Sequence, residues 1–350
     1  MQCISFPAGL IKISTPYKKL DKISGLEYVD PRIRQTRGNI MQNTALIIDT
    51  RSGNGLTTDH LASYVQSIDA SASTIASYGG ALKRLFAYLQ QQGITHPDAD
   101  DLRGWKRELL ATAKPNTAQL YITAARQFFA YLSERGLYQD IARNLKGVKV
   151  TRGFKKDYLT PDQVVAVCDN AACLRDRAML TLMFTTGIRC CEVVRADIAD
   201  LRPAGDSPAL YVQRKGQLEA NQYVKLSPRT DKILREYIAS RGKVDDNQPL
   251  FTSDANRNKG QRLTTMSISR ICKTTFRAAG YDSPRLTAHS TRHTAATLNA
   301  LAGASSEENQ QLLGHRDAAS VRFYDHAASR IKNNSEARIE AMIWGNPAGR

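Results

Sequence analysis

Between Leu56 and Val148, apolar side chains recur at steps of three and four residues, the period of helices with one buried face. Turn signals divide this region into short segments: Gly93 and Gly136 each end an apolar run, and Pro115 opens one. The pattern predicts four short helices that bury their apolar faces against one another. Such helices form a compact all-α domain.

The second half of the chain follows a different pattern. Thr160-Pro161-Asp162-Gln163 has the form of a capping box with proline at the first helical position, so a helix is predicted to begin there. Residues 210–213 and 222–226 are strand-like, with Lys215 at the tip of the hairpin that they predict. Helices are predicted over residues 175–185, ending at Gly187, and near 230–240, 264–279, 290–301, 306–313 and 318–328. The whole chain is therefore predicted to be mainly α with a small β-sheet, in a helical domain followed by a mixed α/β domain.

A run of basic residues and glycines joins the two parts and predicts a basic linker; its members are Lys146, Gly147, Lys149, Arg152, Gly153, Lys155 and Lys156. The expected boundaries are an N-terminal extension over residues 1–55, the helical domain over 56–148, the linker over 149–158, the mixed domain over 159–330 and a C-terminal tail over 331–350. The extension has weak periodicity. It could be an arm, an accessory DNA-binding segment or a segment without function.

The chain of 350 residues carries 49 Lys and Arg against 33 Asp and Glu, a formal net charge of +16. This excess favours a polyanionic partner such as nucleic acid, although a protein can also be basic without binding one. Basic side chains also alternate with the apolar positions of the helical domain, where they form either a solvated face or a face that follows DNA phosphates; they are Lys83, Arg84, Lys106, Arg107 and Arg126.

The sequence has no apolar stretch near the ~20 residues of a membrane helix and no signal peptide, so we expect a cytoplasmic protein with no membrane partner. Its six cysteines form no CxxC pair. We interpret them as reduced thiols, mostly core fillers, and we expect neither a metal nor a cofactor.

Metal-free cleavage of a phosphodiester requires a particular set of side chains. Arginines must stabilise the charge that develops on the non-bridging oxygens, a hydroxyl must act as nucleophile, and the leaving 5′ oxygen needs a proton. Two arginines, one or two histidines, a lysine and a tyrosine would suffice.

The C-terminal domain contains such a set, each member in a distinct sequence context. Arg189 follows the glycine that ends a predicted helix, and Glu192 comes three residues later. His289 and Arg292 are one helical turn apart in an H-x-x-R pair. His315 follows in Leu-Gly-His. Lys215 and then Tyr324, within Arg-Phe-Tyr-Asp-His, complete the set.

In their order and spacing these motifs resemble those of the tyrosine recombinase family, which includes phage integrases and Xer-type recombinases. The resemblance covers residues 159–330 and extends more loosely to the helical region, which looks like the core-binding, SAM-like domain of the family. The sequence departs from the usual pattern at Cys190, Cys191, Ala288, Thr291 and Val321. None of these positions carries a catalytic group.

The resemblance implies a role for each residue. Arg189 and Arg292 would clamp the scissile phosphate, and Lys215 would protonate the leaving oxygen. His289 would exchange a proton near the nucleophile, and His315 would hydrogen-bond a non-bridging oxygen. Tyr324 would form the 3′-phosphotyrosine. Glu192 is expected to orient Arg189 or to support the local fold.

Family membership would also imply partners: double-stranded DNA held between the two domains, a homotetramer on two DNA sites that exchanges strands through a Holliday junction, and an accessory DNA-bending protein as a further candidate. The extra N-terminal residues favour integration and excision of a mobile element. Resolution of DNA dimers in the manner of Xer proteins is the alternative.

Two other classes of activity stay open: a type IB topoisomerase-like enzyme and a catalytically silent DNA-binding regulator. A metal site built from His289, His293, His315 and His326 is disfavoured, because no cysteine or carboxylate spacing completes it. The apolar face of the tail, around Ile339 and Ile343, either packs on its own domain or docks on a neighbouring protomer, and we favour the neighbour.

Overall fold

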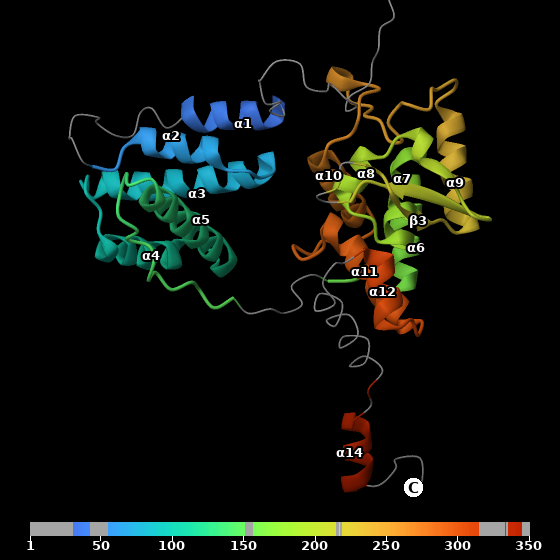
Figure 1. The fold of residues 1–350 in the computed structure, drawn as a ribbon. Coiled ribbons are helices and arrows are strands. Elements are labelled where there is room, and N and C mark those ends of the chain that lie inside the picture. The colour runs from blue at the N-terminus through green and yellow to red at the C-terminus, as the bar shows by residue number, and fades with distance from the viewer. Residues whose placement is uncertain are drawn as a thin grey trace, which may run out of the picture. The chain divides into compact units, whose positions relative to one another are not determined.

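The computed structural model describes residues 31–42, 55–150, 157–214, 217, 219–314, 333 and 335–344. The chain divides into two compact units, Met1–Thr151 and Arg152–Arg350, called here the N-terminal and C-terminal units. Figure 1 shows the described part of the first as helices alone and that of the second as helices around a small sheet.

The N-terminal unit contains the four predicted helices, α2 (Thr58–Ser67), α3 (Ala72–Gln91), α4 (Ala99–Thr112) and α5 (Pro115–Glu134). Their ends follow local chemistry. Ser71 caps α3, Asp98 caps α4 by accepting from the N–H groups of Asp100 and Asp101, and proline opens α5. Gly93 and Gly136 both have φ of +66°, a conformation that ends a helix at little cost for glycine.

Aromatic rings fill the centre of this unit. Phe128 of α5 meets Tyr64 of α2 at 5.4 Å between ring centroids and Phe86 of α3 at 5.9 Å, both edge to face. Trp105 of α4 is buried in the same core. Side chains from all four helices therefore share one core.

A further helix, α1 (Pro31–Gln42), packs on this bundle and was not predicted from the sequence. Ile40 is buried against Gly79 of α3, where a Cβ would lie 2.5 Å from the isoleucine Cδ1. Arg37 of α1 donates to the carbonyl of Ile68 at 3.0 Å. Part of the N-terminal extension thus belongs to the helical unit, where Ile40 packs closely on a glycine of α3.

The C-terminal unit is built around α7 (Leu174–Thr186), which is buried along almost its whole length. Around it lie α6 (Pro161–Asp169), α9 (Pro228–Ser240) and α11 (Ala288–Leu301). Thr160 and Gln163 form the expected capping box of α6. The other helices among the described residues of the unit are α8 (Cys190–Arg195), α10 (Thr265–Ala278), α12 (Ser306–Leu313) and α14 (Ser335–Trp344), with short 3₁₀ turns at Ile198–Asp200 and Asn256–Asn258.

The sheet has three antiparallel strands in the order β1 (Leu201–Ala204), β2 (Ser207–Val212) and β3 (Gln222–Lys225). Leu210 in the middle strand pairs with Leu201 on one side and Val224 on the other. β2 and β3 were predicted, but β1 was not. Pro203 interrupts its pattern, and proline is tolerated there because β1 is an edge strand.

Candidate active site

Arg189 stands at the junction of α7 and α8. Gly187 ends α7 in the left-handed conformation, with φ of +63°, and Arg189 is the N-cap of α8. Its Nη1 lies 2.8 Å from Oε1 of Glu192, and its backbone N–H donates to Oε2 at 2.9 Å. The Glu192 side chain is completely buried, whereas that of Arg189 is 27% exposed. The carboxylate therefore holds a guanidinium that still reaches solvent.

Arg292 is a buried arginine on α11, with 1% of its surface exposed. Its Nη1 donates to the carbonyl of Gly187 at 2.7 Å, and its Nη2 donates to the carbonyl of Leu313 at 2.6 Å. Gly187 precedes Arg189 by two residues, and Leu313 precedes His315 by two. Arg292 thus ties together two of the motifs found in the sequence.

His289 lies one turn before Arg292 on α11, and it is exposed. Its ring meets the ring of His293 edge to face, with centroids 4.7 Å apart. The H-x-x-R pair therefore places a solvent-facing imidazole next to a guanidinium fixed in the interior.

Arg214 was missed by the sequence analysis, and it joins the same cluster. Its side chain is 7% exposed, its Nη1 lies 3.5 Å from Oε2 of Glu192, and the same nitrogen donates to the carbonyl of Leu313 at 3.0 Å. Its Nε donates to Oε1 of Gln222 at 3.2 Å. Burial lowers the pKa of this guanidinium, while the Glu192 carboxylate opposes the shift and Arg189 adds to it. A basic residue in a hairpin ordinarily faces solvent, so no sequence signal distinguished this one.

Three guanidinium groups and one carboxylate therefore meet where α8, α11, β2 and α12 converge. Arg189 and Arg214 share Glu192, and Arg214 and Arg292 share the carbonyl oxygen of Leu313. The cluster keeps an excess of positive charge in a largely buried setting. Such an arrangement suits a phosphate, whose oxygens match the planar fork of arginine.

Lys215, His315 and Tyr324 lie outside the described residues, as do the predicted helix near 318–328 and most of the linker. The residues directly before Lys215 and His315, Arg214 and Gly314, are both part of the cluster. Four of the seven predicted site residues and supports, Arg189, Glu192, His289 and Arg292, are thus placed by the structure. The other three stay predictions.

Two further predictions concern metals and membranes. Among the described residues, no three His, Cys, Asp or Glu side chains are grouped so that they could hold a metal ion. His315 and His326 are not among them. None of the described helices combines the length and apolarity that crossing a membrane requires.

Cys190, which directly follows Arg189, is partly buried and packs against the core of the unit. Burial raises the pKa of the Cys190 thiol to about 11, and the neighbouring Cys191 adds to this shift. The thiol is therefore protonated and unreactive near neutral pH. This agrees with the interpretation of Cys190 as a packing residue.

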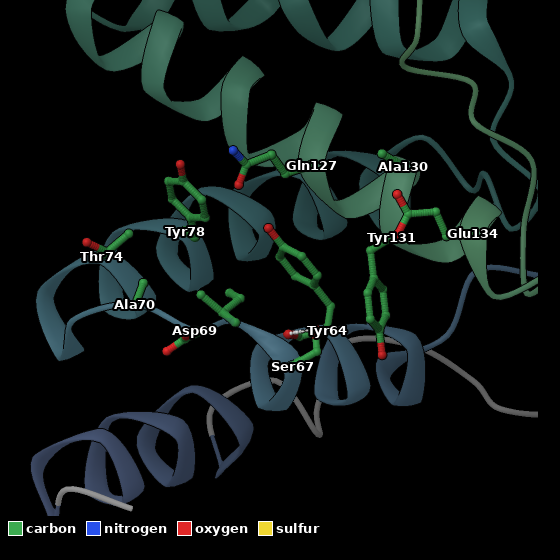
Figure 2. A pocket seen from close by; sticks show the side chains of 11 residues that line it. Tyr64, Ser67, Asp69, Ala70, Thr74, Tyr78, Gln127, Ala130, Tyr131 and Glu134 are labelled. Carbon is green, nitrogen blue, oxygen red and sulfur yellow. Dashed lines mark hydrogen bonds between the residues drawn. The ribbon is translucent and has the colours of Figure 1, made fainter.

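A hollow on the N-terminal unit, bounded by α2, α3 and α5, has a volume of about 420 Å³. Figure 2 shows the side chains that line it. Tyr64, Tyr78 and Tyr131 line its walls, and Asp69 and Glu134 bring negative charge to it. No lysine or arginine is among the described residues that line it. This surface is ill suited to DNA phosphates. The basic side chains of α3, α4 and α5 are better candidates, and Arg84, Arg107 and Arg126 among them are exposed.

Two family profiles match the chain. Residues 157–330 match the phage integrase family, and residues 56–136 match the N-terminal SAM-like domain of phage integrases. One match lies in each unit, and the first includes the motifs around Arg189 and Arg292.

Curated relatives include Xer recombinases of several bacteria. The tyrosine recombinase XerC of Corynebacterium glutamicum is 30% identical over 189 residues, which cover 52% of this chain and 58% of that protein. The tyrosine recombinase XerD of Bifidobacterium longum is 28% identical over 211 residues, covering 55% and 64% respectively. The chain thus spans less than two thirds of the length of either relative.

Solved structures share the fold. The XerH site-specific recombinase bound to a palindromic difH substrate matches with a TM-score of 0.63 at 17% identity, covering 92% of this chain and 99% of that one. A lambda integrase tetramer bound to a Holliday junction matches with a TM-score of 0.60 at 19% identity, covering 83% and 87%. The predicted fold class is confirmed: a helical, SAM-like core-binding domain followed by a mainly helical catalytic domain with a small sheet.

Proposed function

The chain belongs to the phage integrase family of tyrosine recombinases, and we propose that it cleaves and rejoins DNA strands through a 3′-phosphotyrosine intermediate. The observation that carries the proposal is the cluster of Arg189 and Arg292 beside the buried Glu192. It supplies fixed cationic donors of the kind that a pentacoordinate phosphate requires.

In the proposed reaction, the phenol oxygen of Tyr324 attacks the scissile phosphorus and the bond from phosphorus to the 5′ oxygen breaks. Lys215 gives a proton to that leaving oxygen, and His289 accepts the proton of the phenol. Arg189, Arg292 and His315 hold the non-bridging oxygens. A 5′ hydroxyl of a partner strand then reverses the steps, so the energy of the phosphodiester is retained and no nucleotide cofactor is consumed.

The test uses nicked suicide duplexes that tile the DNA flanking the gene, incubated with the protein without added metal. We expect a covalent protein–DNA adduct on a denaturing gel with the unchanged chain and none with Tyr324→Phe. Tight binding of a fragment with no adduct would instead support a catalytically silent DNA-binding regulator. Rapid relaxation of supercoiled plasmid without a specific site would favour topoisomerase-like activity.

The proposed assembly is a homotetramer on two double-stranded DNA sites that exchanges strands through a Holliday junction, with an accessory DNA-bending protein as a further candidate partner. Exposed apolar side chains on α14 support docking of the C-terminal helix on a neighbouring protomer: Ile339 is 57%, Met342 91% and Ile343 60% exposed. Met342→Asp is expected to prevent the tetramer on paired sites while leaving binding to a single site intact. Band-shift assays would separate the two.

For the biological role we propose integration and excision of a mobile element, with Xer-like resolution of DNA dimers as the alternative. The additional N-terminal segment, including α1, supports the first, and the matches to XerC and XerD proteins support the second. Sequencing the adduct separates them. An adduct at the junction of an inserted element supports integration, and an adduct at a single chromosomal site elsewhere supports resolution.

A further inference from the structure

We propose that Arg214 is a positioning residue for cleavage, which sets Lys215 and His315 relative to the phosphate clamp. This inference rests on the function proposed above. Arg214 itself is not proposed to touch the phosphate; it acts through the residues that it holds.

The contacts of Arg214 bridge three separate segments of the chain. Its guanidinium reaches Glu192 of α8, the carbonyl of Leu313 at the end of α12, and Gln222 on the facing strand of its own hairpin. With 7% of the Arg214 side chain exposed, its contacts with Glu192 and Leu313 are made in the interior, and its contact with Gln222 is made at the surface. A planar group with three such partners has a single orientation, and the backbone that carries it is fixed accordingly.

The chain order makes these contacts relevant to catalysis. Lys215 is bonded directly to Arg214, so the anchored residue is the last fixed point before the proposed general acid. On the other side, Leu313 and Gly314 directly precede His315. One guanidinium therefore anchors the chain immediately before two of the predicted catalytic residues.

The packing on Gly314 is equally specific. Gly314 has φ of +56°, and a Cβ at this position would lie 2.5 Å from Cζ of Arg214 and 2.8 Å from both Nε and Nη1. The guanidinium thus occupies the space that a side chain at residue 314 would need. Glycine is required here both by its backbone conformation and by its close approach to Arg214.

The charge of Arg214 also bears on Arg189. Glu192 is completely buried, and a buried carboxylate must be neutralised. Because Arg214 lies 3.5 Å from the second carboxylate oxygen, Arg189 does not neutralise Glu192 alone. More of the positive charge of the partly exposed Arg189 is therefore available to a substrate phosphate.

The experiment measures single-turnover adduct formation by Arg214→Lys on the nicked duplex that the unchanged chain cleaves. Lysine keeps the charge but has one nitrogen, so it cannot reach all three partners. We expect cleavage to slow by up to about 100-fold, the scale of a small misplacement of catalytic groups. Arg202→Lys is the matched control: Arg202 is on β1 of the same sheet, stacked over Tyr211 at 3.9 Å, and its replacement should leave the rate unchanged.

A second duplex separates positioning from general damage. In it, sulfur replaces the 5′ bridging oxygen at the scissile phosphate, and the departing thiolate needs no proton. If Arg214 positions Lys215, Arg214→Lys should be slowed less on this duplex than on the oxygen duplex, and the slowing that remains reports on the position of His315. Equal slowing on both duplexes, or no slowing on either, would overturn the inference.

Gln222→Leu covers the case in which Arg214→Lys does not fold. Gln222 is exposed, so its replacement removes one contact of Arg214 without disturbing the core. We expect a smaller loss on the oxygen duplex that the sulfur duplex restores; a rate equal to that of the unchanged chain on both duplexes would count against the inference. Absence of an adduct with the unchanged chain on every flanking duplex would overturn the proposed function, and this inference with it.

Discussion

The cores of the two units bury different kinds of side chain. In the N-terminal unit the largest fully buried residues are apolar and aromatic, among them Trp105, Phe86 and Phe128. Across the ranges that the structure describes, every buried residue of polar or charged type lies in the C-terminal unit; examples are Glu192, Arg214, Thr294, Arg292 and Asn309.

Buried side chains therefore serve different purposes in the two units. Apolar burial stabilises a unit without fixing any polar group, which suffices for a domain whose working surface is its exterior. Buried polar groups cost stability unless each finds a partner, but they hold a site in one geometry. Three of the buried polar residues of the C-terminal unit, Glu192, Arg214 and Arg292, meet at the candidate site.

Phe128→Ala should have the largest effect on stability. Phe128 contacts rings from two other helices, and removing such a side chain from a core costs about 3–5 kcal/mol. Denaturant unfolding followed by the fluorescence of the buried Trp105, in a Trp344→Phe background, would report on the N-terminal unit. A change below about 1 kcal/mol would mean that the aromatic cluster is not what stabilises the unit.

Arg292→Ala should have the largest effect on chemistry. It removes a proposed phosphate donor together with the links to Gly187 and Leu313. We expect adduct formation to slow by about 10²–10³-fold, or roughly 3–4 kcal/mol. Arg126→Ala, an exposed arginine of the N-terminal unit, is the control and should retain the rate of cleavage at saturating protein. A similar loss in both variants would contradict a clamp at Arg292.

Two buried threonines on α11 provide a matched pair for smaller effects. The Thr294 hydroxyl accepts from the backbone N–H of Leu159 at 3.0 Å, whereas the buried Thr297 hydroxyl has no hydrogen-bond partner among the described residues. Thr294→Val should therefore destabilise the C-terminal unit by about 1–3 kcal/mol. Thr297→Val should be neutral or stabilising, since no bond is lost. Thermal unfolding would test both, and equal effects would show that the polar core is not organised by its individual hydrogen bonds.

The same contrast explains what the sequence could predict. Helices of the apolar core follow from periodicity, and two of their ends follow from Gly93 and Gly136, because these signals are local. The start of α6 in the C-terminal unit follows in the same way from the Thr160 capping box. The ordered motifs identified Arg189, Glu192, His289 and Arg292. Arg214 could not be found in this way.

The features that the sequence did not reveal depend on contacts between distant residues. Arg214 is buried because Glu192 and Leu313 lie beside it, and neither is near it in the chain. Helix α1 forms against Gly79 of α3, again a distant partner. Strand β1 is the exception, because it pairs with the adjacent β2 and was missed because its own proline hides its pattern. Tertiary contact, not local propensity, decided the other two cases.

The smallest expected effect concerns how the N-terminal unit contacts DNA. If its basic face follows the phosphate backbone, Arg84→Ala removes one phosphate contact and lowers the slope of log affinity against log salt by about 1. Arg135, which lies over Tyr131 at 4.7 Å beside the acidic hollow of Figure 2, should be away from the DNA, so Arg135→Ala should leave the slope unchanged. Band-shift titrations at several salt concentrations measure both. Equal slopes for the two variants would mean that the basic face of this unit is solvated, and that the C-terminal unit, with its buried arginines, carries the phosphate contacts alone.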